Sequence, residues 1–205
     1  MKTIALIIGA LLISLCPMTY AQSNNKIKKN MENKKVLVAF FSRADENYNV
    51  GHIEKGNTHI VAEMIAQKTS GELFHIVTVK PYPAEYTPCV KQAKQEKESG
   101  ARPEIKGDVK VEEYDVVYLG YPNWWGDMPM AVYTFIEKHD WKGKTVIPFC
   151  THEGSGLSGT EEKIRQACKG ATVEKGLAIK GSVAQNSRDK AKQSVDIWLG
   201  VSEKR

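Results

Sequence analysis

Three short segments of the sequence combine residue types that suit the binding of a phosphate and of a planar ring. The first begins with Ser42-Arg43 and ends with Gly56-Asn57-Thr58, directly before a stretch with helical periodicity. Backbone N–H groups in the first turn of a helix are unpaired and carry partial positive charge, which favours phosphate. The hydroxyls and the arginine add donors, and Gly56 permits close approach of the backbone. Alternatively, Asn57 or Thr58 only caps the helix.

The second segment places two adjacent tryptophans in a loop that follows an apolar stretch. Its candidate binding residues are Pro122, Asn123, Trp124, Trp125 and Gly126. Exposed aromatic surface is costly unless something covers it, and a planar ligand stacked on an indole would cover it. Gly126 would leave room for a ring edge to meet the backbone. The alternative is that the tryptophans pack against a neighbouring loop.

The third segment is rich in glycine and follows another apolar stretch. Its candidate binding residues are Thr151, His152, Glu153, Gly154, Ser155 and Gly156. Glycines free backbone N–H groups to point at a ligand carbonyl or ring nitrogen. His152 is either a general acid or an incidental loop histidine, so the sequence assigns no catalytic residue.

The elements that must position these segments alternate between strand and helix. Apolar or alternating patterns predict strands at residues 36–41, 73–79, 116–120, 145–150 and 172–179. Helical patterns predict helices that begin near residue 60 and before residue 131, and at residues 86–98, 161–168 and 189–199. Such alternation predicts an α/β protein with a parallel sheet covered by helices on both faces. Ligands bind such sheets at the carboxyl ends of the strands, where all three segments lie.

On these three segments the chain resembles the flavodoxins, specifically the group with a long first loop, over residues 35–199. The resemblance implies a three-layer α-β-α sandwich with a five-stranded parallel sheet in the order 2-1-3-4-5. It implies flavin mononucleotide (FMN) as cofactor, with the phosphate at Ser42, Arg43, Asn57 and Thr58. The isoalloxazine ring would lie between residues 123–126 and residues 151–156.

Two features depart from simple flavodoxins. Residues 44–55 separate the serine from the Gly-Asn-Thr motif, and Tyr48, His52 and Ile53 in this insert either fold over the site as a lid or only decorate it. Flavodoxins that shuttle electrons are usually acidic, whereas this chain has a formal net charge of +5. The redox partner is therefore open: an unknown partner protein or a quinone-like substrate.

Three functions remain open from the sequence. The first is an electron carrier that uses its flavin, and the second is an FMN-dependent NAD(P)H:quinone or nitro-compound reductase. The third is a non-redox binding module on the same fold. Near a flavin, the carboxylates of Glu153 and Asp127 are expected to disfavour a negatively charged reduced form.

The N-terminus predicts export. Residues 1–21 read as a secretory signal peptide with a short apolar run and cleavage after Ala21, and residues 22–34 read as a flexible linker. The folded domain would span residues 35–205, periplasmic or secreted, without stable membrane insertion after cleavage. Lipidation at Cys16 or an uncleaved anchor are the alternatives.

The remaining composition indicates no further site. Cys89, Cys150 and Cys168 are an odd number once the signal is removed, so no disulfide framework is predicted, and no cysteine or histidine has metal-ligand spacing. The lysines do not gather into a patch interleaved with aromatic residues, so we expect no nucleic-acid binding.

Overall fold

The computed structural model describes residues 34–201, so the predicted signal peptide and nearly all of the predicted linker lie outside the described residues. Its main sheet has the strand order β5-β4-β1-β6-β7-β8, and β9 also pairs with β7. The bounds of these strands are β1 Val36–Phe41, β4 Glu72–Thr78, β5 Ile105–Lys106, β6 Val116–Pro122, β7 Thr145–His152, β8 Thr172–Val173 and β9 Leu177–Lys180. The parallel run β4-β1-β6-β7 is the predicted order 2-1-3-4, with β8 and β9 in fifth place.

The structure differs from the predicted sheet in two places. The predicted fifth strand is broken into β8 and β9. Val146 of β7 pairs with Val173 and Phe149 pairs with Leu177, so one extra residue lies between the two paired positions on the β8–β9 side. The break lies beside Pro148, which has no N–H to donate to the ladder. At the opposite edge, β5 adds a short antiparallel strand against β4.

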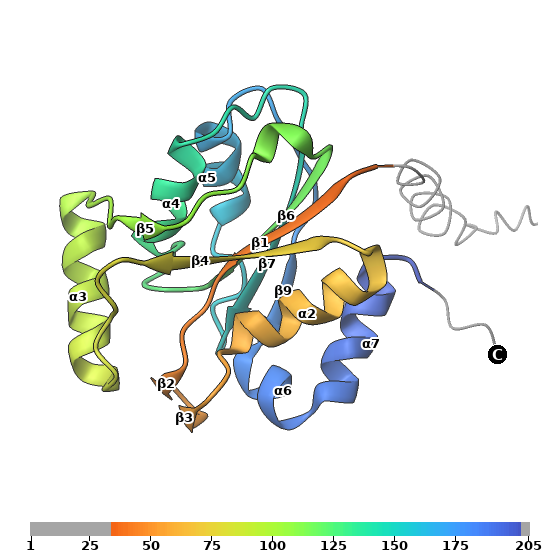
Figure 1. Ribbon diagram of the computed structural model, residues 1–205. Coiled ribbons are helices and arrows are strands. Elements are labelled where there is room, and N and C mark those ends of the chain that lie inside the picture. Colours follow the sequence, from red (N-terminus) through yellow and green to blue (C-terminus); the bar gives the residue numbers. More distant parts are fainter. Residues whose placement is uncertain (1–33, 202–205) are drawn as a thin grey trace, which may run out of the picture.

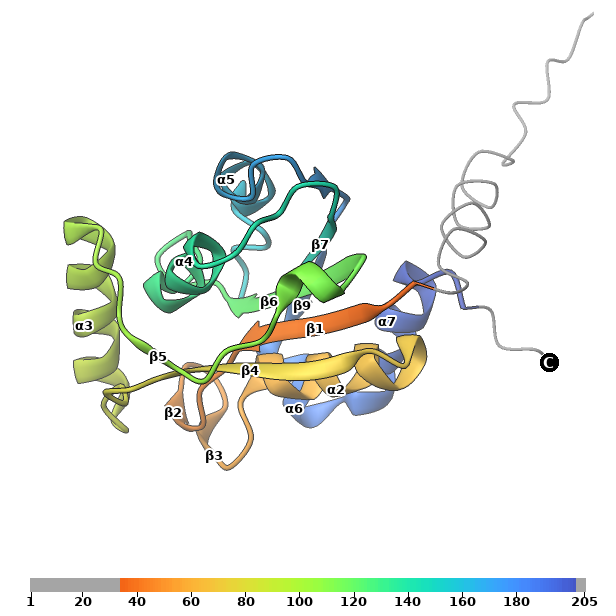
Figure 2. The same ribbon diagram turned by 45° about the horizontal axis from the view of Figure 1, so that its top comes forward.

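Helices cover both faces of the sheet (Figures 1 and 2). One face carries α2 (Asn57–Thr69), α6 (Gly181–Asn186) and α7 (Arg188–Trp198), and the other carries α4 (Met130–Glu137) and α5 (Thr160–Ala167). Helix α3 (Tyr86–Ser99) lies beside α4 at the β5 edge, and a 3₁₀ turn spans Val111–Glu113. Helix α6 was not predicted.

Strand β1 shows why the sequence predicted a sheet buried on both faces. All six of its residues are buried. Leu37, Ala39 and Phe41 pack in one hydrophobic core, and the alternate residues Val36, Val38 and Phe40 pack in the other. The continuous apolar run therefore serves two cores at once.

The insert, residues 44–55, forms a separate hairpin. Its strands are β2 (Asp45–Asn47) and β3 (Gly51–Ile53), which pair antiparallel to each other and not with the main sheet. The hairpin projects beyond the carboxyl end of β1, on the same side as the start of α2 (Figure 1). Among residues 34–201, no helix is long and apolar enough to cross a membrane.

Candidate functional site

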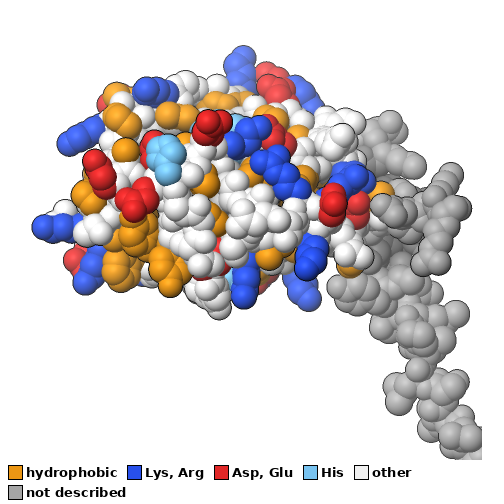
Figure 3. All heavy atoms as spheres, turned by 90° about the horizontal axis from the view of Figure 1, so that it is seen from below, with side chains coloured by type: hydrophobic (Ala, Val, Ile, Leu, Met, Phe, Trp, Pro, Cys, Tyr) orange, Lys and Arg blue, Asp and Glu red, His pale blue; other side chains and the backbone are white. Residues whose placement is uncertain are grey.

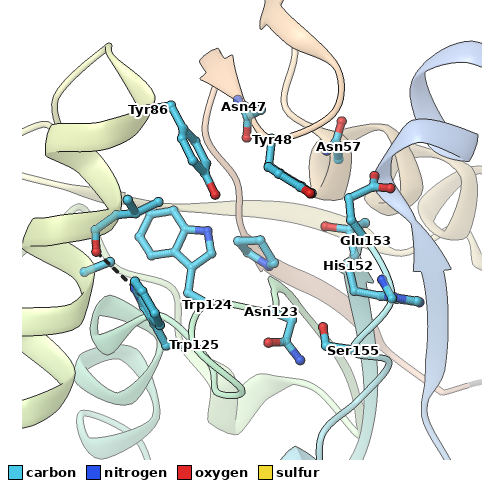
Figure 4. Close-up of a pocket in the computed structure, with 15 residues that line it drawn as sticks. Asn47, Tyr48, Asn57, Tyr86, Asn123, Trp124, Trp125, His152, Glu153 and Ser155 are labelled. Carbon is cyan, nitrogen blue, oxygen red and sulfur yellow. Dashed lines mark hydrogen bonds between the residues drawn. The ribbon is translucent and has the colours of Figure 1, made fainter.

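A cavity of about 620 Å³ opens at the carboxyl ends of the central strands (Figure 4). Its volume lies within the range of roughly 300–1,000 Å³ that is usual for small-molecule sites. All three predicted segments contribute to its wall, through Asn57, Pro122, Asn123, Trp124, Trp125, Thr151, His152, Glu153, Gly154 and Ser155. The remaining predicted residues do not line the cavity: Ser42, Arg43, Gly56, Thr58, Gly126 and Gly156.

The start of α2 forms a close-fitting backbone cradle. Gly56 is the N-cap residue, and neither Asn57 nor Thr58 caps the helix with its side chain. Instead, the Ser42 hydroxyl accepts the His59 N–H at 3.1 Å. A Cβ at Gly56 would lie 2.3 Å from Ser42 Oγ and 2.4 Å from the Arg43 carbonyl oxygen. Only glycine lets the start of α2 approach Ser42 and Arg43 so closely.

Two side chains connect this cradle to the rest of the site. The hydroxyls of Thr58 and Thr151 share a buried hydrogen bond of 2.7 Å, which joins the start of α2 to the end of β7. The Oδ1 atom of Asn57 is buried and has no hydrogen-bond partner among the described residues. Because Asn57 lines the cavity, this oxygen can accept a hydrogen bond from a ligand hydroxyl.

The Arg43 side chain points away from the predicted phosphate position. Its guanidinium donates to the carbonyl oxygens of Glu46, Pro83 and Ala84. Carbonyl oxygens therefore occupy the donors that the sequence assigned to a phosphate. The structure gives this side chain a positioning role between the insert and the loop before α3.

The tryptophan segment is a tight two-residue turn. Trp124 and Asp127 exchange backbone hydrogen bonds of 2.9 and 3.1 Å, and Trp125 and Gly126 occupy the turn with φ of 58° and 72°. Positive φ at both central positions is the type I′ pattern that matches the twist of antiparallel strands. Glycine adopts it freely, but a bulky residue such as Trp125 does so rarely, and such strain is concentrated at functional sites.

The two tryptophans have different surroundings. Trp124 is partly buried, with its ring edge-on to Phe41 and Tyr82 at centroid distances of 5.4 and 5.1 Å. Trp125 is 50% exposed, and its indole N–H donates to the Val90 carbonyl of α3 at 3.0 Å. The sequence left two alternatives, a platform for a ligand or packing against a neighbouring loop. Trp124 both lines the cavity and packs against the hydrophobic core.

Asp127 is turned away from the cavity. Its carboxylate is buried and accepts hydrogen bonds from the Met128 N–H and the Tyr133 hydroxyl. Its other oxygen lies 2.5 Å from the Lys163 ammonium. The expectation that Asp127 would act on a flavin is corrected, because Lys163 neutralises its charge and it does not line the cavity.

Hydrogen bonds connect the third segment to the second. The Asn123 side chain donates to the Gly156 carbonyl and the Ser158 hydroxyl, both at 2.9 Å, and accepts the Gly126 N–H at 3.0 Å. His152 Nδ1 accepts the Gly154 N–H at 2.9 Å, which places the proton of the neutral ring on Nε2. Burial lowers the pKa of His152, against the opposing effect of Glu153.

Glu153 links three parts of the chain. One carboxylate oxygen accepts the Ser182 N–H at 2.5 Å, and the other accepts the Ser182 hydroxyl at 2.9 Å. It therefore supplies an acceptor at the start of α6. The second oxygen also accepts a hydrogen bond from the Asn49 side chain of the insert at 3.1 Å.

Five residues of the cavity wall escaped the sequence assignment. Asn47 and Tyr48 come from the insert, and Tyr86, Val90 and Ala93 come from α3. The last three recur at intervals of four and three residues, so they mark one face of the helix that the sequence predicts at residues 86–98. That spacing is the sequence signal that could have assigned these three residues to the wall. For Tyr48, the sequence indicated only a position in the insert and no role as a binding residue.

The described residues show no further chemical centre. Cys89, Cys150 and Cys168 are free and buried, and burial raises the pKa of the Cys150 and Cys168 thiols to about 12. Within residues 34–201 no cluster of three histidine, cysteine or carboxylate side chains could hold a metal ion.

A family model described as Flavodoxin matches residues 35–196. The chain belongs to the flavodoxin family. Candidate flavoproteins of known structure from Bacteroides eggerthii and Bacteroides uniformis are both 29% identical to it, with TM-scores of 0.65 and 0.62. The alignments cover 82% and 80% of this flavodoxin and 98% of each structure.

A flavoprotein from Lactobacillus acidophilus, solved in complex with FMN, is 19% identical to this flavodoxin over 73% of it and 96% of that structure, with a TM-score of 0.57. This likeness bears on the fold alone. No protein in the comparison with curated sequences matches. Family membership supports FMN as the cofactor, and the residues fit it: a helix start for a phosphate, the unpartnered Asn57 oxygen for a hydroxyl, and aromatic walls for a ring.

Proposed function

We propose that this flavodoxin binds FMN in the cavity and carries electrons through it. The observation that supports the proposal is the arrangement of one cavity with the N-terminus of α2 at one end and Trp124 at the other. These are the features that a phosphate and a planar ring require. When bound, FMN supplies reversible electron transfer at its ring.

The chain's own residues divide the work of binding. At the cradle, the N–H groups of Asn57 and Thr58 have no acceptor within the helix and can donate to phosphate oxygens. The Ser42 hydroxyl accepts from His59, so its own proton remains available to a phosphate oxygen. At the other end, Trp124, Tyr48 and Tyr86 surround the cavity with aromatic surface that excludes water from the ring.

Glu153 is the carboxylate placed to influence the flavin. It lines the cavity, whereas Asp127 does not. A negative charge beside the ring disfavours a negatively charged reduced flavin and lowers its potential. The amide of Ser182 at the start of α6 offsets part of this charge.

A comparison of FMN with riboflavin tests the binding mode. Riboflavin lacks the phosphate, so we expect it to bind about 10- to 100-fold more weakly, which corresponds to the loss of one charge-assisted hydrogen bond or more. Titration of the purified protein, followed by visible absorption and flavin fluorescence, measures both affinities. Failure to take up FMN would refute the proposal, and equal affinities would remove the phosphate from it.

Electron carriage is tested separately from binding. The FMN-loaded protein, reduced photochemically, is mixed with a one-electron acceptor such as cytochrome c, and reoxidation is followed at the flavin absorbance. A carrier is reoxidised in a single turnover and does not consume reduced nicotinamide by itself. Steady consumption of NADH or NADPH with a quinone would instead identify a reductase.

The surface around the cavity mouth does not select a partner by charge. Viewed from the side of β2, β3 and α6, basic and acidic side chains are interspersed (Figure 3). Most of the net positive charge of the sequence belongs to residues outside 34–201. The basic character noted in the sequence therefore gives no reason to propose an acidic partner.

We further propose that this chemistry takes place outside the cytoplasm. The predicted signal peptide at residues 1–21 supports this, and it lacks a twin arginine, so the chain would cross the membrane unfolded and bind FMN afterwards. Cell fractionation of the full chain with measurement of bound flavin tests it. FMN-loaded protein found in the cytoplasm only would contradict it.

A further inference from the structure

The insert, residues 44–55, crosses the mouth of the cavity. Its hairpin pairs Asp45 with Ile53 and Asn47 with Gly51, and the tip is formed by residues 48–50. Asn47 and Tyr48 line the cavity, opposite the tryptophan segment (Figure 4). The insert therefore forms part of the cavity wall even though it belongs to neither core.

The base of the insert is firmly attached on the α3 side. The Arg43 guanidinium donates to the carbonyls of Glu46, Pro83 and Ala84. The Glu46 N–H donates to the Ala84 carbonyl at 3.1 Å, and the Glu46 carboxylate accepts the Tyr86 N–H at 2.7 Å. These hydrogen bonds fix the first strand of the hairpin to the start of α3.

The tip is held by much less. The Asn49 side chain donates one hydrogen bond of 3.1 Å to Glu153, across the cavity from α3. The Tyr48 ring lies 5.9 Å from the Tyr86 ring, yet Tyr48 is 62% exposed and so is not anchored by burial. Glu153 itself is fixed by both polar groups of Ser182. Among residues 34–201, the tip is thus held by one exposed hydrogen bond to the β7 loop and one ring contact with α3.

We propose that the insert is a latched gate: its tip carries Tyr48 as a removable wall of the FMN site, and the Asn49–Glu153 hydrogen bond is the latch. Opening needs only the loss of that hydrogen bond and the Tyr48–Tyr86 contact, while the base stays attached through Arg43 and Glu46. The gate sets how fast FMN enters and leaves. This inference rests on the proposed FMN site.

The latch is tested first without FMN. In the FMN-free protein, Asn49→Ala is expected to raise amide hydrogen exchange at the tip by about 2- to 10-fold, the factor that corresponds to one net hydrogen bond. Exchange at residues 43–46 should remain unchanged. Asn186→Ala makes the same chemical change at the exposed end of α6 and should leave both regions unaffected. Equal exchange in Asn49→Ala and the unmodified protein would overturn the latch.

The rates of FMN binding test the gate. Stopped-flow fluorescence is expected to show that Asn49→Ala raises the association and dissociation rate constants together by about 2- to 10-fold, with a smaller change in affinity. Tyr48→Ala removes the wall itself, so it should raise the dissociation rate constant further and also lower the affinity. Normal FMN affinity with unchanged rates in both variants would overturn the gate and leave the FMN site intact. Absence of FMN binding in the unmodified protein would refute the FMN site, while the exchange result would still decide the latch.

Discussion

The two ends of the cavity are formed by different kinds of residue. The α2 end consists of small residues and backbone, where Gly56 approaches Ser42 and the Arg43 backbone so closely that a Cβ at Gly56 would lie 2.3 Å from Ser42 Oγ. The opposite end consists of large rings, with Trp124 resting on Phe41 and Trp125 half exposed against α3.

This difference predicts two patterns of response to substitution. Backbone donors at a helix start act only at hydrogen-bond distance, so the α2 end should tolerate no added volume. Aromatic surface contributes roughly in proportion to the area it covers, so losses at the other end should be graded. The contrast can therefore be tested residue by residue.

Gly56→Ala should have the largest effect. The new Cβ must displace Ser42 Oγ and the Arg43 carbonyl, which lie 2.3 and 2.4 Å from its ideal position. We expect FMN affinity to fall at least about 100-fold, together with a loss of about 1–3 kcal/mol in the free energy of unfolding from overpacking. Fluorescence titration and urea unfolding measure the two effects.

Gly100→Ala is the matched control for that substitution. Gly100 is the C-cap of α3 with φ of 61°, and a Cβ there would meet nothing within 4 Å. It should cost about 1 kcal/mol in stability from backbone strain and leave FMN affinity unchanged. Equal FMN affinities in the two variants would show that the cradle at Gly56 is not part of the site.

The adjacent tryptophans should separate binding from stability. Trp124→Ala should lower the free energy of unfolding by about 2–3 kcal/mol, because its ring packs on the core. Trp125→Ala should change it by less than about 1 kcal/mol, because half of that side chain is exposed. Each should weaken FMN binding by about 1–3 kcal/mol if ring stacking contributes as it does for nucleobases.

Urea unfolding and FMN titration of the two single variants decide this point. Unchanged FMN affinity in both would remove the tryptophans from the binding site. Equal losses of stability would contradict the difference in packing between the two rings.

The fold was predictable from the sequence where side-chain pattern alone determines structure. The apolar run of β1 indicates burial on both faces, and the helical pattern near residue 60 corresponds to α2. Elements that depend on distant partners were not predictable. The start of α6 relies on the Glu153 carboxylate, 29 residues away, and β5 is a two-residue strand defined by its pairing with β4.

The site divides in the same way. The three segments were found because their residue types are unusual for loops, and the sheet brings them together. The sequence could not show which way a charged side chain turns. Arg43 and Asp127 both looked available to a ligand, but one is taken up by backbone carbonyls and the other by Lys163.

Asp127→Asn tests whether the tryptophan turn depends on this buried charge. Removing it leaves Lys163 without its partner, so we expect the free energy of unfolding to fall by about 1–3 kcal/mol. FMN affinity should change less than about threefold, because Asp127 does not line the cavity. A large loss of affinity without loss of stability would place Asp127 in the binding site after all.

The smallest expected effect is a pH dependence of the free energy of unfolding, to which the histidines at the α2 end should contribute more than His152. The rings of His59 and His75 lie 5.3 Å apart behind the cradle. Burial lowers the pKa of His59, Glu63 raises it, and His75 and Lys55 lower it further. Burial also lowers the pKa of His75, whereas the hydrogen bond to the Ser42 carbonyl raises it. Each folded pKa therefore lies below the unfolded value of 6.5.

The unfolded chain consequently binds more protons between the lowered pKa values and 6.5, and the free energy of unfolding rises with pH in that window and levels off above it. Urea unfolding at pH 8 and pH 5.5 should show this slope in the FMN-free protein. His75→Asn should flatten it more than His152→Asn, because it also removes the neighbour that disfavours protonation of His59. A loss of packing in either variant lowers the free energy of unfolding equally at pH 8 and pH 5.5, so it does not change the slope with pH. Equal slopes in the two variants would contradict a coupled histidine pair behind the cradle.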